Sequence, residues 1–118
     1  MRYLLAIIEP PDQRRERTEA EGHEAYERML RYADELKQQG KLLAAESLSS
    51  LANAARVEVR GGRPRIQDGP FVEAKEMIGG FFLVDCASMA EAIELAKRCP
   101  AAEWCKVEVR AAAPCYDA

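Results

Sequence analysis

The chain has few of the residues that mark a metal centre, a disulfide scaffold or a membrane helix. His23 is its only histidine, and its four cysteines are scattered without a close pair. Zinc sites use ligands paired at short spacing, and disulfide frameworks are rare in cytosolic chains of this size. No glycine-rich phosphate loop follows a strand, and no apolar run approaches the roughly 18 residues of a membrane span. We therefore expect no metal, no cofactor and no membrane partner.

An excess of charge of one sign is also missing. The formal net charge is −3, and charged residues (31%) are mixed with hydrophobic ones (48%). This composition is typical of a globular protein and does not suggest nucleic acid as a partner. The arginine-rich run 14–17 contains Glu16 and predicts a solvated helix face. Glu9 and Pro10 end the first apolar run too early for a signal peptide, which indicates a cytoplasmic location.

Periodicity predicts the first strand and the first helix. Residues 3–8 form a continuous apolar run, as expected for a central strand. Residues 13–39 favour helix, with an apolar stripe at helical spacing from Tyr26 onward. Gly22 is expected to separate a frayed first turn from the main helix, and Gly40 is a typical residue just beyond a helix end.

The rest of the chain predicts further strands, one hairpin and a second helix. Gly61-Gly62 predicts the hairpin turn, and Ser88 with Glu91 predicts a capping box that opens the second helix. The order of elements predicts one α+β domain over residues 1–118, a ferredoxin-like βαββαβ fold with an inserted hairpin. The expected strands are 42–48, 55–60, 63–67, 81–85 and 104–110, and the expected helix is 89–98.

Such a sheet has helices on one face only, so its other face needs a cover. A second copy of the chain is the simplest cover. We therefore expect a homodimer, with the cleft between the two sheets as the default site for a small molecule.

The most specific stretch is Asp68-Gly-Pro-Phe-Val-Glu-Ala-Lys-Glu-Met-Ile-Gly-Gly-Phe-Phe82. It combines a turn, a charged segment, and Gly79-Gly80, where another backbone or a ligand can approach closely. The stretch resembles the signature of the YCII-related, or DGPF, family of small bacterial proteins. The resemblance covers nearly the whole chain, because it extends to residues 1–5, 40–48, 98–100 and 107–110.

This resemblance implies a ferredoxin-like fold that pairs as a dimeric α+β barrel, without a settled activity. It also implies an association with extracytoplasmic-function sigma factors. YCII-related proteins have a proposed His/Asp pair on the first helix, and at about the matching positions this chain has Met29 and Gln38. A hydrolase- or lyase-like activity based on that pair therefore lacks its residues here.

The candidate catalytic residues are Glu46, Lys75 and His23. Histidine is the residue type that titrates near neutral pH, although the charged neighbours of His23 also fit an exposed position at a helix start. Glu46 lies on an otherwise apolar strand, where a carboxylate is costly to bury unless it is paired. If Glu46 faced a barrel interior near Lys75, the two would form either an acid/base couple or a structural salt bridge.

The predicted ligand-binding residues follow the hairpin: Asp68, Phe71, Glu73, Lys75 and Glu76. Structural roles are open for two of them, Asp68 as the cap of its own turn and Phe71 as an anchor of the loop in the core. Glu73 and Lys75 are expected to point to the same side if the segment is extended.

Three functions remain open from the sequence. The favoured one is a cytosolic homodimer that binds a small organic ligand in the cleft between two sheets. The ligand is either neutral or anionic. The second is a lyase- or isomerase-type enzyme of the dimeric-barrel kind. The third is a partner protein in sigma-factor-linked transcriptional regulation, which rests on the family resemblance alone.

Overall fold

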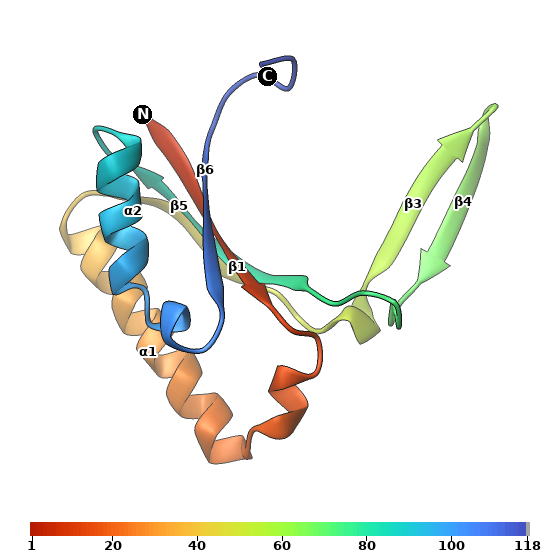
Figure 1. Cartoon of the computed structure of the whole chain (residues 1–118), viewed down its shortest axis with the longest axis horizontal. Helices are drawn as coiled ribbons and strands as arrows, with labels where there is room; N and C mark the ends of the chain where they lie inside the picture. The colour runs from red at the N-terminus through yellow and green to blue at the C-terminus, as the bar shows by residue number, and fades with distance from the viewer. Residues whose placement is uncertain (118) are drawn as a thin grey trace.

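A computed structural model describes residues 1–117, so Ala118 lies outside the described residues. Helices α1 (Glu19–Gln38) and α2 (Met89–Arg98) cover one face of a four-stranded antiparallel sheet (Figure 1). The order of the strands is β2-β5-β1-β6. This arrangement confirms the predicted ferredoxin-like α+β fold. The strands of this sheet are β1 (Arg2–Glu9), β2 (Leu42–Ser47), β5 (Met77–Asp85) and β6 (Lys106–Ala111).

The core lies between the sheet and the two helices. Side chains of a strand alternate between its faces, so Leu5 and its neighbours two positions away point toward the helices. Tyr32 of α1 donates a hydrogen bond from its hydroxyl to the carbonyl oxygen of Leu95 in α2, 2.6 Å away. The ring of Tyr32 also meets that of Phe82 edge to face, with centroids 5.1 Å apart. Burial of each large apolar side chain contributes about 1.5–3 kcal/mol, and this layer holds the helices on the sheet.

Helix α1 begins at Glu19, before the break that the sequence predicted at Gly22. The hydroxyl of Thr18 accepts a hydrogen bond from the backbone N–H of Glu21, and the Glu21 carboxylate accepts one from the N–H of Thr18. This reciprocal capping box starts the helix at Glu19 and leaves Gly22 inside it, so the predicted break at Gly22 is wrong. The preceding residues form a separate 3-10 turn, η1 (Gln13–Glu16).

Two strand boundaries also differ from the prediction. β5 begins at Met77, so Gly79-Gly80 lies inside the strand, next to a bulge in its pairing with β1. A Cβ at Gly80 would lie 2.7 Å from the carbonyl oxygen of Glu46 in the neighbouring strand, so the glycine permits close backbone approach. β6 begins at Lys106, because the 3-10 turn η3 (Pro100–Glu103) takes up the residues after α2.

The predicted hairpin is present and forms a separate two-stranded sheet, β3 (Ala55–Arg60) with β4 (Arg63–Asp68). We call residues 55–68 the arm. Gly61 and Gly62 form its two-residue turn with φ of 57° and 75°, a conformation that favours glycine. All side chains of both strands are exposed. Figure 1 shows the arm apart from the four-stranded sheet, on the side opposite to α1 and α2.

The face of the four-stranded sheet that points away from the helices is apolar in its centre. We call this surface the open face. Phe81 and Leu83 alternate along β5 with the buried Phe82 and Val84, so they point to this face. Its apolar residues on β1 and β5 are Leu4, Ala6, Ile8, Ile78, Phe81 and Leu83.

Candidate functional site

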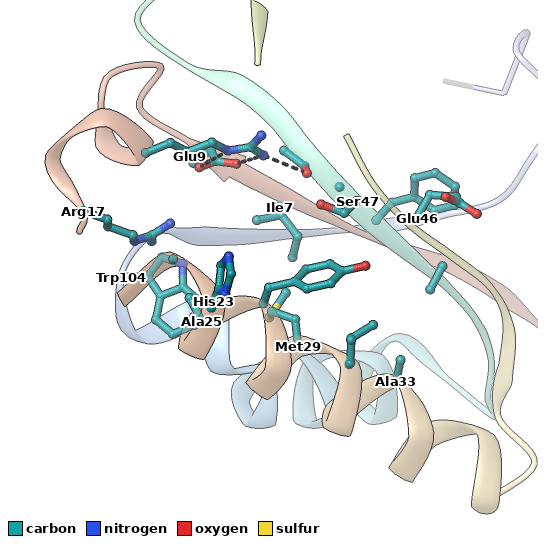
Figure 2. A pocket seen from close by; sticks show the side chains of 18 of the residues that line it. Ile7, Glu9, Arg17, His23, Ala25, Met29, Ala33, Glu46, Ser47 and Trp104 are labelled. Carbon is teal, nitrogen blue, oxygen red and sulfur yellow. Dashed lines mark hydrogen bonds and ion pairs between the residues drawn. The ribbon is translucent and has the colours of Figure 1, made fainter. Parts of the chain in front are cut away.

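A cavity of about 600 Å³ lies between the N-terminal half of α1 and the sheet. Figure 2 shows its wall, with α1 on one side and the strands β1, β2 and β5 on the other. One end carries ionisable and polar side chains, and the other carries apolar ones. No single segment forms this site, because the wall also includes Trp104, which follows η3.

The polar end is built around a buried ion pair, Glu9 with Arg14. Arg14 Nη2 donates a hydrogen bond to Glu9 Oε1 at 2.7 Å, and the side chains of Arg14 and Glu9 are 30% and 6% exposed. The same guanidinium donates to the carbonyl oxygens of Leu48 at 2.7 Å and Gly79 at 3.1 Å. A buried carboxylate is costly unless it is paired, and here the pairing also ties η1 to the ends of β1 and β2 and to β5.

Gly79 makes the space for this pair. A Cβ at position 79 would lie 1.6 Å from Glu9 Oε1 and 3.0 Å from Arg14 Nη2. The sequence predicted close approach of a backbone or a ligand at Gly79-Gly80, and at Gly79 the group that approaches is the carboxylate of Glu9. The register shift between Ile7 and Ile8 leaves Gly79 as the extra residue on β5. Glu9 lies on the inner face because it continues the alternation of Tyr3, Leu5 and Ile7 along β1.

Arg17 and His23 lie at the same end of the cavity, beside Trp104 (Figure 2). The guanidinium of Arg17 lies over the indole ring, 5.4 Å from its centroid, and that of Arg28 lies 5.3 Å from it. Arg28 also pairs with Glu103. Arg17 has no such partner among residues 1–117; its Nη2 donates a long hydrogen bond to Gln13 Oε1 at 3.5 Å. The guanidinium that borders the cavity without a carboxylate is therefore Arg17.

The apolar end is formed by side chains of α1 and the inner face of β1. Tyr26 and Leu30 are about half exposed, at 52% and 51%, although both are large and apolar. They line the cavity together with Ile7 and Met29. An apolar ring or chain placed here would cover these surfaces, as in most small-molecule sites.

Cys105 lies next to the polar end and is half-buried. Burial raises the pKa of its thiol to about 11, and the negative charge of Glu9 adds to the effect. A thiol with this pKa is almost entirely protonated near neutral pH and is a poor nucleophile. Cys105 therefore contributes packing to this region rather than a reactive thiolate.

The predicted catalytic residues do not come together. His23 is exposed on α1 and lines the cavity. Glu46 borders it, but its strand position pairs with Phe81 of the open face, and Figure 2 shows its carboxylate directed away from the cavity. Lys75 is exposed and does not line this cavity. The ion pairs of residues 1–117 do not include Glu46 with Lys75. A catalytic role for these residues stays a prediction.

The predicted ligand-binding residues lie at the base of the arm, and none of them lines the cavity. Phe71 is buried, but it packs outside the main core, under the guanidinium of Arg56 at 3.8 Å. Glu73 pairs with Arg56 at 3.3 Å, and Glu76 pairs with Lys106 at 3.0 Å. Their role in binding a ligand stays a prediction.

The loop itself differs from the expected geometry. The N–H of Ala74 donates to the carbonyl oxygen of Phe71 and closes a turn over residues 71–74, and the chain bends again at Lys75. Glu73 and Lys75 are therefore not on one extended segment. Asp68 is exposed at the end of β4, and its carboxylate accepts no hydrogen bond from the part of the chain described. The N–H of Gly69 donates instead to the carbonyl oxygen of Ala54, which holds the base of the arm.

Sequence reasoning missed Glu9, Arg14 and Arg17. The run 14–17 was interpreted as a solvated helix face, which holds for Arg15 with Asp12 but not for Arg14. A signal for Glu9 was present, because it continues the inward alternation of Tyr3, Leu5 and Ile7 on β1. Nothing in the local sequence indicates that Arg17 meets Trp104, since that contact joins distant segments.

Within residues 1–117, no group of three or more His, Cys, Asp or Glu side chains is arranged to hold a metal ion. Over the same range, neither helix combines the length and the apolar character that a membrane crossing needs.

Comparison with known proteins identifies the family. The family described as "YCII-related domain" matches residues 1–114. An uncharacterized protein of Rhizobium meliloti (strain 1021) is 41% identical over 58 residues, which are 49% of this chain and 47% of that protein. The match thus spans about half the length of this curated relative. The family match covers the arm, the loop after it and the cavity, and the chain belongs to the YCII-related family.

Proposed function

We propose that this protein is a single-domain, homodimeric binding protein for a small organic anion, which occupies the cavity between α1 and the sheet. The observation that carries the proposal is the charge of the cavity wall. Glu9 neutralises Arg14, whereas Arg17 has no carboxylate partner among residues 1–117. A guanidinium without a partner beside a cavity is a suitable donor for the carboxylate of a ligand.

The other carboxylates of the wall oppose this charge weakly. Glu46 belongs to the other face of the sheet. Glu19 is exposed in the first turn of α1, where the positive end of the helix dipole offsets its charge. His23 adds a ring N–H at the same end as Arg17 (Figure 2). The polar end therefore favours an anion over a cation.

The dimensions also support a small ligand. Sites for drug-sized molecules have volumes of about 300–1,000 Å³, with mostly apolar walls and a few polar groups. The cavity of about 600 Å³ has this character, with Ile7 and Met29 opposite the polar end. This location differs from the expected one, because the sequence suggested a cleft between two sheets.

The open face supports a homodimer. Ile78 is 55% exposed, and Leu4, Ile8, Phe81 and Leu83 are partly exposed on the same surface. A contiguous apolar surface of this kind on a small protein marks an interaction site. Light scattering at micromolar concentration is expected to give twice the mass of one chain, and a stable single-chain mass would contradict the dimer.

A lyase- or isomerase-type enzyme is the second candidate, favoured by the position of His23 in the wall. A general base needs a partner that orients it or a substrate within hydrogen-bond reach. The imidazole of His23 makes no hydrogen bond or ion pair with residues 1–117, so no protein group orients it. Binding is therefore the better-supported function.

Calorimetric titration with pairs of an acid and its neutral amide tests the proposal: benzoate with benzamide, phenylacetate with phenylacetamide, and hexanoate with hexanamide. We expect at least one acid to bind, and its amide to bind at least tenfold more weakly. Equal affinity for an acid and its amide would contradict recognition of an anion. Absence of binding by all three acids would contradict a site for small apolar carboxylates.

A further inference from the structure

The arm has two chemically different faces. Side chains alternate along each strand, and the pairing places Val57 opposite Ile66 and Val59 opposite Pro64 on one face. We call Ala55, Val57, Val59, Pro64 and Ile66 the apolar stripe. Its three large β-branched residues are strongly exposed: Val57 by 66%, Val59 by 56% and Ile66 by 69%. The opposite face carries Arg56, Glu58, Arg60, Arg63, Arg65 and Gln67.

This arrangement is unusual for a hairpin on its own in water. Two paired strands are marginally stable unless a third strand or another layer covers an apolar face. In the described part of the chain, β3 and β4 pair with each other and with no further strand, and all their residues are exposed. Within residues 1–117, the chain therefore supplies no cover for the apolar stripe.

We propose that the apolar stripe packs against a second copy of this chain, so that in a dimer each arm contacts the other chain. The inference rests on the dimer proposed above, and it adds an interface outside the open face. The position of the arm supports it, because the arm stands on the side of the sheet away from α1 and α2 (Figure 1). A partner seated on the open face would lie on that same side of the molecule.

The charges of the arm favour the same partner. Its four arginines outnumber Glu58 and Asp68, which gives residues 55–68 a net charge of +2. The whole chain has −3, so the remainder has −5. An arm that reaches a second copy therefore meets a body of opposite charge, and opposite potentials favour association of the two surfaces. In a symmetric dimer, the contact is made twice.

The base of the arm is fixed, which lowers the entropy lost on docking. Phe71 is 4% exposed under the guanidinium of Arg56, and Arg56 also pairs with Glu73. A Cβ at Gly69 would lie 1.8 Å from the carbonyl oxygen of Leu51, so the chain is closely packed there. A segment held in position before binding retains more of its contact energy as affinity.

Sedimentation velocity of two arm variants tests the interface. Ile66→Asp places a charge in the apolar stripe, and Gln67→Asp places the same charge on the opposite face of the same strand. We expect Ile66→Asp to raise the dissociation constant of the dimer at least tenfold and Gln67→Asp to change it less than threefold. Equal dissociation constants for wild type and Ile66→Asp would overturn the arm interface alone. A monomeric wild type would overturn the proposed dimer as well, and the acid titrations above would still report on ligand binding.

A second measurement does not alter the apolar stripe. A spin label is attached to Arg63→Cys, on the other face of the arm, in a background with Cys105→Ser and Cys115→Ser. Labelled chains are mixed with ¹⁵N-labelled chains of that background that lack the added cysteine. We expect broadening of amide signals in the ¹⁵N chains, which then vanishes on dilution below the dissociation constant. A wild-type dimer whose mixed sample shows no intermolecular broadening would overturn the proposal.

Discussion

The carboxylate of Glu9 occupies the space in which a side chain at Gly79 would begin. A Cβ at that position would lie 1.6 Å from Glu9 Oε1, far inside van der Waals contact. The Gly79-Gly80 segment of β5 thereby explains how the carboxylate of Glu9, near the start of the chain, fits inside the fold. It leaves room for the buried Glu9–Arg14 pair, which in turn forms the floor of the cavity at its polar end.

Gly79→Ala is expected to destabilise the fold by about 1–3 kcal/mol, as overpacking in a well-packed interior usually does. Gly22→Ala is the matched control, because a Cβ at Gly22 meets nothing within 4 Å and the residue lies inside α1. That control should be neutral or stabilising by up to about 1 kcal/mol. Urea unfolding measures both changes. Equal stability of the two variants would mean that the Glu9 side chain moves aside at little cost.

Phe71→Ala is expected to loosen the base of the arm. Its ring is buried under Arg56, and removal of a buried phenylalanine ring costs about 3–5 kcal/mol. Because Phe71 lies outside the main core, we expect the loss to be local, with faster hydrogen exchange at Gly69, whose N–H bonds to Ala54. Lys75→Ala, at an exposed position, should change stability by less than about 0.5 kcal/mol. Unchanged exchange at Gly69 in Phe71→Ala would show that the ring does not hold the arm.

His23→Ala is expected to weaken ligand binding without changing the stability of the fold. The residue is exposed, so its removal should change the free energy of unfolding by less than about 0.5 kcal/mol. Any acid that binds in the cavity should nevertheless bind more weakly, because one donor at the polar end is lost. Thermal melts and calorimetry on one sample measure both quantities. A large loss of stability would contradict the exposed position of the side chain.

Low pH is expected to destabilise the N-terminal ends of α1 and α2. Hydrogen bonds from the backbone and hydroxyl of Thr18 lower the pKa of Glu21, and the backbone N–H of Ala87 followed by Lys41 lowers that of Glu91. For carboxyls whose pKa is lower in the folded state, the stabilising contribution is full above the unfolded value of 4.5 and is lost as pH falls through the folded pKa. Unfolding in urea at pH 6 and pH 3 should show this loss, and Glu21→Gln should reduce it more than Glu24→Gln. Identical pH dependence of the two variants would contradict the role of the capping box.

Most of the fold could be predicted from the sequence, because its signals are local. The apolar run 3–8, the turn at Gly61-Gly62 and the cap at Ser88 each reflect their own neighbours, and the order of elements then limits the topology. The break at Gly22 was wrong for a local reason too, since the capping box of Thr18 with Glu21 outweighs the low helix propensity of one glycine.

The site could not be predicted in the same way, because it joins distant segments. Arg14 bonds to Glu9, to Leu48 and to Gly79, which three separate strands or strand ends supply. The run 68–82 drew attention because its charges are dense, yet the structure uses its ion pairs at the base of the arm and beside β6. Charge density along the sequence indicated exposed pairs rather than the cavity.

The most direct test of an anion site in the cavity compares two arginines of the same run. Arg17 borders the cavity, whereas Arg15 is exposed and pairs with Asp12. Wild type, Arg17→Gln and Arg15→Gln are titrated calorimetrically with the tightest-binding acid from benzoate, phenylacetate and hexanoate. We expect Arg17→Gln to lose about 1.5–3 kcal/mol of binding free energy, roughly a 10- to 150-fold rise in Kd, while Arg15→Gln binds like wild type. Equal Kd values for the two variants would contradict the proposed site.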